Sequence, residues 1–506
     1  MLKTIKKVLV ANRGEIAVRI IRSCRDLGVQ TVAVYSEPDA TSPHSLLADE
    51  SVCIGPAASA ESYLKMDTII KVAKETGSDA IHPGYGFLSE NAAFARKCEE
   101  NGIIFIGPSP ESIDAMGDKM RAREMMKNAG VPYPPGTKKA LEDVAEAKKF
   151  AGEIGFPVLI KAAAGGGGKG MRIVNDPESF ESGIKAAQSE ARNAFGDERV
   201  YVEKYLESPR HVEFQILADH HDNYIHLFDR ECSIQRRHQK VIEEAPCAIL
   251  DDELRFEMAK AALAAARACD YYGAGTIEFM VDKHRNFYFL EMNTRLQVEH
   301  PITEKITGID LVEWQLRIAE KQPLSFKQED LRRNGHAIEC RISAENPVEQ
   351  FLPSTGKLRY FKPVSGAGIR VDEGVRSYQQ ISIDYDPLIA KLITWGKNRE
   401  EAIQRMKRAL DEFEVSGVHT TIPFCRYVMD HDAFRHANYD THFVSEHFSG
   451  DKLNNLAAEN TVAAAAALLK HHDNEKQTIK TPKITGQNAD GAQNNALWWK
   501  NRQKNR

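Results

Sequence analysis

The sequence predicts an α/β region at the N-terminus followed by α+β regions. Strand and helix patterns alternate over roughly the first hundred residues, and elements that alternate in this way form a parallel sheet with helices on its faces. Strand patterns dominate the middle of the chain, and strands mixed with one clear helix follow near its C-terminal end. A length of 506 residues fits about three domains.

The expected elements of the first region follow from apolar spacing and from Gly and Asn stop signals. We expect strands over residues 7–10, 29–35, 79–82 and 103–106, with helices over 16–27, 66–76 and 88–101. The region ends near Ile113.

The middle region, residues 114–330, begins with a helix over 118–129 and contains a small α/β unit at about 137–203. Strands are expected over 156–162, 201–206, 211–218, 224–230, 275–282 and 287–293. A third region, 331–447, mixes strands over 336–342 and 368–373 with a helix over 399–413. Asn, Ala, Gln, Lys and Asp dominate residues 448–506, which we predict to be largely disordered.

Composition excludes several classes of function. The net charge of -5 provides no overall basic field, so nucleic acid is not an expected partner. Eight scattered cysteines without a CxxC pair are typical of reduced thiols. The N-terminus lacks a signal-peptide pattern, and no apolar run is long enough to cross a bilayer. We therefore expect a cytoplasmic protein without membrane contact.

A glycine run at residues 165–168 lies between two expected strands and follows Lys161. Glycines remove every side chain that would block a phosphate, and their N–H groups can point at its oxygens. Lys161 adds a point charge. The alternative is a flexible surface loop. The run is not a P-loop, because no GxxxxGK[ST] pattern fits, and we expect it to close over a nucleotide as a lid.

Paired acids are expected on two neighbouring strands near residue 280. On the second strand Phe287, Phe289, Glu291 and Asn293 share one face, and Glu278 can lie across from them in a hairpin. Two carboxylates and an amide oxygen form a hard-oxygen site that suits Mg²⁺. The alternative is acids on a solvated strand face, which the bulky apolar neighbours make less favourable.

Residues 291–304 read EMNTRLQVEHPITE. Its first nine residues include polar or charged side chains at positions 291, 293, 295, 297 and 299, and a surface loop explains the whole set poorly. This segment resembles the signature of biotin carboxylases, members of the ATP-grasp superfamily. Further matching motifs are ANRGEIAVRI at 11–20, IHPGYGFLSEN at 81–91, FIGPSPESI at 105–113, GDK at 117–119, KAAAGGGGKGMR at 161–172, EKYLESPRHVEFQ at 203–215, CSIQRRHQKVIEEAP at 232–246, ECRISAE at 339–345 and FLPSTGK at 351–357. The resemblance covers about residues 1–447.

The resemblance implies a division into three domains. These are a Rossmann-like domain at 1–113, an ATP-grasp domain at 114–330 with a mobile lid at about 137–203, and an α+β C-terminal domain at 331–447. Its implied nucleotide-binding residues are Lys119, Lys161, Gly167, Gly168, Glu203, Lys204, Tyr205, Leu206, His211, Gln235, His238, Glu278 and Glu291. Its implied metal ligands are Glu278, Glu291 and Asn293, the set that strand alternation also suggests.

For the chemistry, the resemblance implies that Lys240, Arg295 and the backbone N–H of Val298 bind bicarbonate. Glu299 resembles the general base, and we expect an ordinary pKa near 4, which leaves it ionised at pH 7. Arg341 matches the residue that stabilises the enolate oxygen of biotin. The alternative for Arg341 is a salt bridge with Glu339 or Glu345.

The implied reaction uses ATP, Mg²⁺ or Mn²⁺, and bicarbonate to carboxylate biotin through carboxyphosphate, giving ADP, phosphate and carboxybiotin. The chain has no Ala-Met-Lys-Met motif, so we expect a separate biotin carboxyl carrier protein and a separate carboxyltransferase. Relatives are commonly homodimers. The segments DYDPLIAKL and FLPSTGK resemble those of subunits that act with acyl-CoA or pyruvate partners. We expect acetyl-CoA as the final acceptor, for malonyl-CoA and fatty acid synthesis, ahead of propionyl-CoA and pyruvate.

Two rival functions remain at this point. Another ATP-grasp ligase would share the lid and the metal acids but would lack RLQVEHP together with RRHQK. An inactive assembly subunit would be expected to lose Lys240, Arg295 or Glu299, and all are present.

Overall fold

The structure is a computed structural model that describes residues 4–137, 143–162 and 171–453. The glycine run at 165–168 and most of the tail predicted over 448–506 lie outside the described residues. The chain divides into a unit Met1–Gly450 and a unit Asp451–Arg506, and every element named below belongs to the first.

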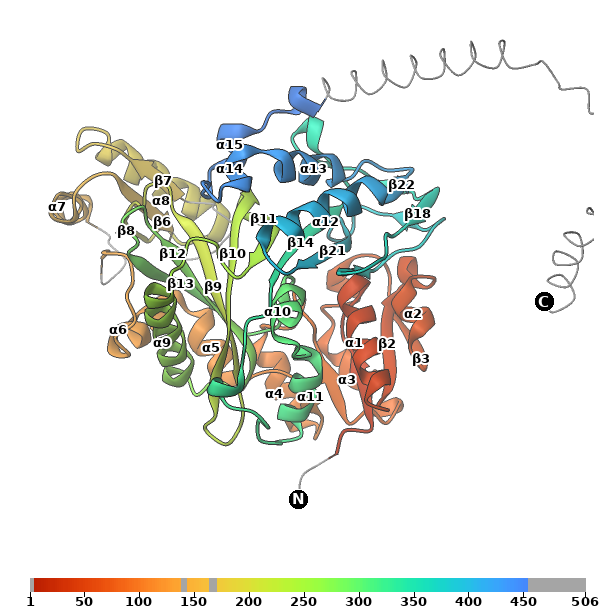
Figure 1. Ribbon diagram of the computed structural model, residues 1–506. Helices are drawn as coiled ribbons and strands as arrows, with labels where there is room; N and C mark the ends of the chain where they lie inside the picture. The colour runs from red at the N-terminus through yellow and green to blue at the C-terminus, as the bar shows by residue number, and fades with distance from the viewer. Residues whose placement is uncertain (1–3, 138–142, 163–170, 454–506) are drawn as a thin grey trace, which may run out of the picture. The chain divides into compact units, whose positions relative to one another are not determined.

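The N-terminal region forms a parallel sheet, as predicted, but the sheet has five strands, and the one at residues 50–55 was not predicted (Figure 1). Its order is β3 (Glu50–Gly55), β2 (Gln30–Ser36), β1 (Lys7–Val10), β4 (Ala80–His82) and β5 (Ile104–Phe105). Side chains of β1 alternate between two cores. Val8 and Val10 pack with Ile16 and Ile20 of α1 (Gly14–Asp26), whereas Leu9 packs on the opposite face, in the core of α3 (Met66–Glu75) and α4 (Ala92–Glu100).

Helix α4 begins four residues later than the predicted start at residue 88. Asn91 ends the preceding loop, and its side chain accepts a hydrogen bond from the N–H of Phe94 at 2.9 Å. An asparagine at this position caps a helix, because its side chain satisfies an N–H that has no partner within the helix. The apolar spacing predicts the helix, but the cap sets its boundary.

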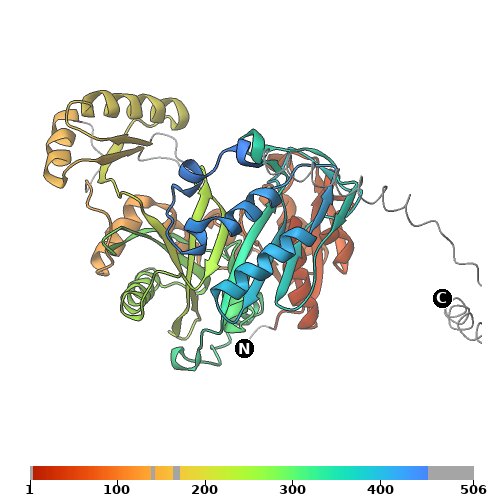
Figure 2. The ribbon, with the colours of Figure 1, turned by 45° about the horizontal axis from the view of Figure 1, so that its top comes forward.

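An eight-stranded antiparallel sheet is the framework of the rest of the unit (Figures 1 and 2). Its order is β13 (Phe287–Asn293), β12 (Gly273–Val281), β9 (Arg210–Ala218), β10 (Tyr224–Arg236), β11 (Gln239–Ala245), β14 (His336–Ser343), β21 (Leu388–Gly396) and β19 (Ile369–Glu373). The last three strands come from residues 331–447, so the sheet continues across the boundary predicted at residue 330. Residues from both regions therefore share one rigid surface.

Strand β10 runs to Arg236, six residues beyond the predicted end at residue 230. The last residue of the predicted strand and the residue after it are Arg230 and Glu231, buried charges that a strand pattern based on apolar residues does not favour. Buried charges are tolerated where they are paired, and both residues are in ion pairs, with Glu213 and Arg210 respectively. Because of these charged residues, the apolar pattern predicted this central strand too short.

The predicted small α/β unit is present. It consists of a three-stranded antiparallel sheet in the order β7 (Met171–Val174), β6 (Val158–Ala162), β8 (Val200–Lys204), with α7 (Val144–Ile154) and α8 (Phe180–Phe195). It has a separate apolar core that includes Val158, Phe180 and Ile184. Figure 2 shows its two helices on the same side of the small sheet. A separate core is consistent with a segment that moves as one piece.

The remaining helices are α2 (Pro43–Leu47), α5 (Pro110–Gly117), α6 (Lys119–Asn128), α9 (Asp252–Ala268), α10 (His300–Thr307), α11 (Leu311–Ala319), α12 (Arg399–Glu412), α13 (Ile422–Asp430), α14 (Asp432–Arg435) and α15 (Phe443–His447). Short strands are β15 (Glu345–Asn346), β16 (Leu352–Pro353), β17 (Gly356–Lys357), β18 (Tyr360–Lys362), β20 (Gln380–Ile381) and β22 (Glu414–Ser416).

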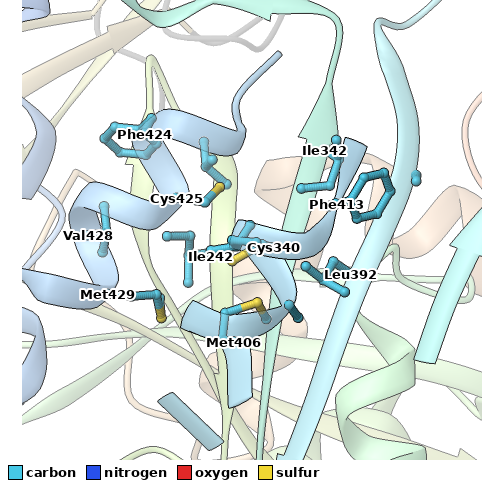
Figure 3. Close-up of a cluster of buried hydrophobic side chains, with 14 of the residues drawn as sticks. Ile242, Cys340, Ile342, Leu392, Met406, Phe413, Phe424, Cys425, Val428 and Met429 are labelled. Atoms are coloured by element: carbon cyan, nitrogen blue, oxygen red, sulfur yellow. The ribbon is translucent and has the colours of Figure 1, made fainter. Parts of the chain in front are cut away.

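Helices α12 and α13 cover one face of β11, β14 and β21 and enclose a large apolar core. Figure 3 shows Phe424 and Val428 of α13 and Met406 of α12 packed towards Ile242 and Cys340 of the sheet. Because the opposite face of these strands turns towards polar residues of the cleft, this core fixes the positions of the strands from behind.

We expect Phe424→Ala to destabilise the protein by about 3–5 kcal/mol, because it leaves a cavity at a fully buried site. Urea denaturation followed by circular dichroism measures the loss. Tyr378→Ala is the matched control, since that ring is 73% exposed, and it should stay within about 0.5 kcal/mol of the parent. Equal losses in both variants would contradict the position of this core.

Candidate active site

A cleft gathers residues from the N-terminal sheet, the small α/β unit and the eight-stranded sheet. The predicted site residues that line it are Lys161, Glu203, Lys204, Tyr205, Leu206, His211, Gln235, His238, Lys240, Glu278, Glu291, Asn293, Arg295, Val298 and Arg341. Glu299 is fully buried directly behind them and contacts Lys240 and Arg341. The side chain of Lys119 and residues Gly167 and Gly168 lie outside the part of the chain that the structure describes.

Glu278 and Glu291 are cross-strand partners on β12 and β13, as predicted, but the predicted alternation of β13 is wrong. A bulge lies between the pairs Phe279–Phe289 and Glu278–Glu291, so Leu290 is the extra residue and is 40% exposed. Phe289 therefore packs into the apolar core, whereas Glu291 faces the cleft. Without the bulge, the two side chains would share a face.

The charge of Glu278 affects the titration of Glu291. The charge of Glu278 raises the pKa of Glu291, and removal of water adds to this shift. Burial alone would also raise the pKa of Glu278, but the charges of Lys240 and His211 outweigh it and hold that pKa well below its usual range. A divalent cation between the two acids would relieve the repulsion, so the donor set fits Mg²⁺.

Asn293 connects this pair to the neighbouring arginine. Its Nδ2 donates to Glu278 Oε1 at 2.9 Å, while its Oδ1 accepts a hydrogen bond from Arg295 Nη2 at 2.9 Å. An amide oxygen has two lone pairs, so Asn293 Oδ1 can accept this hydrogen bond and still ligate a metal ion. The structure therefore brings the three predicted metal ligands together. The oxygen of the third, Asn293, already accepts one hydrogen bond from Arg295.

Lys240 is the centre of charge in the site. Its Nζ lies 2.6 Å from Glu213 Oε2, 2.8 Å from Glu278 Oε1 and 2.7 Å from Glu299 Oε1. Burial alone would lower the pKa of Lys240, but these three carboxylates raise it well above its usual value. The ammonium group therefore stays charged and uses all three of its N–H donors on the three acids.

Glu299 lies between two cations. In addition to Lys240, Arg341 donates from Nη2 to Glu299 Oε2 at 3.0 Å. Burial opposes ionisation, but the charges of Lys240, Arg341 and Arg230 hold the pKa of Glu299 well below its usual range. The expectation of an ordinary pKa is therefore wrong, because the sequence did not show how many cations surround this carboxylate. Glu299 is ionised but is a weaker base than expected.

Arg341 does not form the alternative salt bridge that the sequence suggested. Its guanidinium contacts Glu243 Oε1 at 2.6 Å and Glu299 at 3.0 Å, whereas Glu345 pairs with Arg236. Glu339 lies two positions earlier on the same strand, but neither of its carboxylate oxygens has a hydrogen-bond partner among the described residues, and burial raises its pKa well above the usual value. Arg341 also lines the cleft.

Arg230 is a buried cation that hydrogen-bonds to one of these acids, Glu213. It is 0% exposed and donates to Glu213 Oε1 at 2.5 Å, to Gln215 at 2.7 Å and to Thr303 at 2.9 Å. A buried guanidinium with these partners fixes Glu213, which in turn holds Lys240. Arg230 is thus a structural support of the charged site.

Arg295 reaches the N-terminal region. Its Nε donates to Glu90 Oε2 at 2.8 Å, and the N–H and hydroxyl of the neighbouring Thr294 lie 3.2 and 3.5 Å from Glu90 Oε1. The 291–304 segment is therefore anchored on the N-terminal region as well as on the eight-stranded sheet. Arg295 still lines the cleft, where its guanidinium can approach an anion.

Some of the residues predicted for the nucleotide, Lys161, Glu203 and Lys204, belong to the small α/β unit. Lys161 Nζ lies 2.6 Å from Glu203 Oε2, and Arg123 also pairs with Glu203. The N–H groups of Lys204 and Tyr205 bond to the carbonyls of Pro135 and Pro157 at 2.8 and 3.1 Å. Both N–H groups are therefore already bonded within the protein.

His211 Nε2 lies 2.9 Å from Glu278 Oε2, so it is near the acidic pair as well as in the cleft. Gln235 lies at the far end of β10 and His238 lies in the turn before β11, where it has a positive φ of 65°. The turn Arg237–His238 thus lines the cleft close to Lys240 in the chain.

Sequence reasoning missed Glu213, Arg230, Glu243, Glu90 and Lys391. A signal existed for Glu213, which is two residues from His211 and so shares its strand face. Lys391 stands out as a lysine within the apolar run LIAKLI. The remaining three are Glu90, Arg230 and Glu243. Each pairs with a residue from another strand or loop, and the sequence does not show these pairings.

Three family models match consecutive parts of the chain. They are described as Biotin carboxylase, N-terminal domain over residues 4–113, Carbamoyl-phosphate synthase L chain, ATP binding domain over 118–327, and Biotin carboxylase C-terminal domain over 339–446. Biotin carboxylase 1 of Bacillus subtilis is 55% identical over 441 residues, which are 87% of this chain and 98% of that protein. The chain belongs to the biotin carboxylase family.

Other relatives agree with this biotin carboxylase assignment. A pyruvate carboxylase subunit of Methanothermobacter thermautotrophicus is 54% identical over 88% of this chain and 90% of its own length. A solved structure of the biotin carboxylase domain dimer of Hydrogenobacter thermophilus 2-oxoglutarate carboxylase, in complex with MgADP, ADP and bicarbonate, is 50% identical. Its TM-score is 0.83, and the match covers 88% of this chain and 98% of that one.

The predicted family, fold class and enzyme class are thus confirmed: this biotin carboxylase is an ATP-grasp ligase. Among the described residues, no helix has the length and apolar character needed to cross a membrane.

The repulsion between Glu278 and Glu291 gives a prediction about metal binding. Glu291→Gln should leave the thermal midpoint in EDTA equal to the parent's or higher, because it removes the repulsion. It should lose most of the rise in thermal midpoint that Mg²⁺ with ADP produces. For the parent this rise corresponds to about 2.7 kcal/mol of added stability at a ligand concentration of 100 times Kd. Differential scanning fluorimetry measures both values.

The matched control is Glu257→Gln, an identical change at an exposed position of α9, which should keep the full rise. The same rise in Glu291→Gln as in the parent would show that Glu291 does not hold the metal.

Proposed function

We propose that this biotin carboxylase uses ATP and bicarbonate to carboxylate biotin on a separate biotin carboxyl carrier protein. One observation carries the proposal. The buried carboxylate of Glu299 lies between Lys240 and Arg341, at 2.7 and 3.0 Å, directly behind the cleft that the Glu278–Glu291 pair lines. This arrangement combines, within one charged cluster, a base, two cations and a pair of carboxylates that can bind a divalent metal ion.

The nucleotide is proposed to lie between the small α/β unit and the eight-stranded sheet. Lys161, His211, Gln235 and His238 line the walls of the cleft, and Leu206 is the proposed contact of the adenine. Glu278 and Glu291, with Asn293, would hold Mg²⁺ or Mn²⁺, which when bound neutralises charge on the phosphates. Lys119, Gly167 and Gly168 remain sequence predictions for the same nucleotide.

Bicarbonate is proposed to bind between Lys240, Arg295 and the N–H of Val298, three residues that all line the cleft. Glu299 removes its proton. The low pKa of Glu299 at first opposes this step, but a bound anion shares the charge of Lys240 and so raises the affinity of Glu299 for a proton. Substrate binding would therefore turn a tightly paired carboxylate into a working base.

The reaction then proceeds in two steps. A bicarbonate oxygen attacks the γ-phosphorus, and the bond to ADP breaks, which gives carboxyphosphate. Carboxyphosphate separates into CO2 and phosphate, and the phosphate accepts the N1 proton of biotin while N1 forms its bond to CO2. Arg341 stabilises the negative charge that develops on the biotin oxygen. Closure of the lid at about 137–203 would exclude water during these steps.

For the whole enzyme we propose the domain division 1–113, 114–330 and 331–447, a homodimer in the cytoplasm, and a separate carboxyltransferase. Acetyl-CoA remains our proposed acceptor, and the segments DYDPLIAKL and FLPSTGK support an acyl-CoA or pyruvate partner in general. The similar proteins carry the names of pyruvate and 2-oxoglutarate carboxylases as well as of a biotin carboxylase, so they do not favour one acceptor.

Release of phosphate from ATP tests the proposed reaction. We expect release to require bicarbonate and to increase when free biotin is added, with carboxybiotin detected by mass spectrometry. Stimulation by an amino acid instead of biotin would support another ATP-grasp ligase, and no release under any condition would support an inactive assembly subunit.

Glu299→Gln tests the base. We expect kcat to fall by about 10²–10⁴-fold, the usual contribution of a general base, while the affinity for MgADP stays near that of the parent. Steady-state kinetics and isothermal titration calorimetry measure the two quantities. Glu313→Gln on α11, outside the cleft, is the control and should keep the parental kcat. A full rate in Glu299→Gln would rule out Glu299 as the base.

A further inference from the structure

Lys391 is a fully buried lysine in β21, at 0% exposure, and the proposed reaction does not use it. Its neighbours along the strand are Ala390 and Leu392, which belong to the apolar core. To bury an ammonium group costs several kcal/mol per ion unless it is paired and hydrogen-bonded. The partners of Lys391 therefore indicate what its burial provides.

Those partners come from three distant parts of the chain. Lys391 Nζ donates to the carbonyl oxygen of Val298 at 2.8 Å, lies 3.2 Å from Glu15 Oε2, and lies 3.8 Å from Asp372 Oδ2. Asp372 has a closer partner in Arg370 at 2.7 Å. The shortest of these contacts of the lysine is thus the backbone of Val298, the residue whose N–H we place against bicarbonate.

The sheet register places Lys391 directly beside Arg341. The two residues are opposite each other across β21 and β14, neighbouring strands in Figure 1, so their side chains leave the sheet on the same face. Arg341 holds the carboxylate of Glu299, and Lys391 holds the carbonyl of Val298. Two adjacent cations of the sheet therefore hold two consecutive residues of the 291–304 segment.

The peptide group that carries the Val298 N–H is the one before the Val298 Cα, and it is held by a separate contact. The ring Nδ1 of His300 lies 2.8 Å from the carbonyl oxygen of Gln297, and the Gln297 side chain donates to Glu278 at 3.2 Å. Since the peptide groups before and after the Val298 Cα are both held, the backbone angles of Val298 have little freedom. Loss of the bond from Lys391 would release one of these two groups.

We propose that Lys391 is a positioning residue for bicarbonate, which fixes the Val298 backbone so that its N–H faces the anion. The inference rests on the proposed function. It differs from a purely electrostatic role, in which Lys391 would only neutralise Glu15 and Asp372 at the junction of the N-terminal and eight-stranded sheets. The two roles predict different results when the charge of Glu15 is removed together with that of Lys391.

The test compares Lys391→Met, Glu15→Gln and the double variant in the full-length enzyme. Lys391→Met should raise KM for bicarbonate by about tenfold or more, as expected for a lost hydrogen bond from a charged donor, with KM for ATP within about twofold of the parent. Glu15→Gln keeps the bond to Val298 and should leave KM for bicarbonate near the parental value.

The double variant keeps the test valid if Lys391→Met folds poorly, because it leaves no unpaired Glu15 charge in the interior. KM for bicarbonate should remain raised in it, since the carbonyl of Val298 still lacks its donor. A return to the parental KM in the double variant, or no increase in Lys391→Met, would overturn the positioning role.

A control on the same strand separates local effects from general destabilisation. Thr394→Val removes a buried hydroxyl that donates to the carbonyl of Ala402 at 3.0 Å within the C-terminal region, so it should lower the thermal midpoint without changing KM for bicarbonate. If the parent shows no bicarbonate-dependent ATP cleavage, the proposed function fails. If the parent is active and KM is unaffected in the Lys391 variants, only the present inference fails.

Discussion

The charge balance around Lys240 is the constraint on which the site depends. A single ammonium holds three carboxylates, from β9, β12 and the segment before α10, within 2.8 Å. If it is removed, three buried acids face one another, and the loss of one partner from a buried ion pair typically costs about 3–5 kcal/mol. Because the cluster is so closely balanced, the addition of an anion and a divalent cation shifts proton affinities within it, which is what the proposed chemistry requires.

The eight-stranded sheet makes this balance possible because it carries most of the charged groups on one rigid surface. Glu213, Arg230, Lys240, Glu278, Arg341 and Lys391 all project from its strands. The 291–304 segment leaves the sheet at β13, crosses to Glu90 of the N-terminal region, and returns to be held by Arg341 and Lys391. The apolar core behind β14 and β21, shown in Figure 3, keeps these two cations in position.

Local patterns in the sequence predicted much of the fold, and the family resemblance predicted the set of site residues that the cleft brings together. The Glu278–Glu291 pair was predicted correctly although the alternation was not, since a bulge at Leu290 depends on the partner strand and leaves no local pattern. The low pKa of Glu299 could not be predicted because its cations come from β10, β11 and β14. Strand β10 was predicted too short for a related reason: its charges are stabilised by pairing, which spacing alone does not reveal.

A crystal structure of the enzyme with a non-hydrolysable ATP analogue, Mg²⁺ and bicarbonate tests the central claim most directly. The account predicts a metal ion between Glu278 and Glu291, and a bicarbonate within hydrogen-bonding distance of Lys240, Arg295 and the Val298 N–H. Glu299 should lie next to the bicarbonate, with its bond to Lys240 lengthened from 2.7 Å. A bicarbonate bound away from Lys240, or a metal ion that neither acid contacts, would contradict the account.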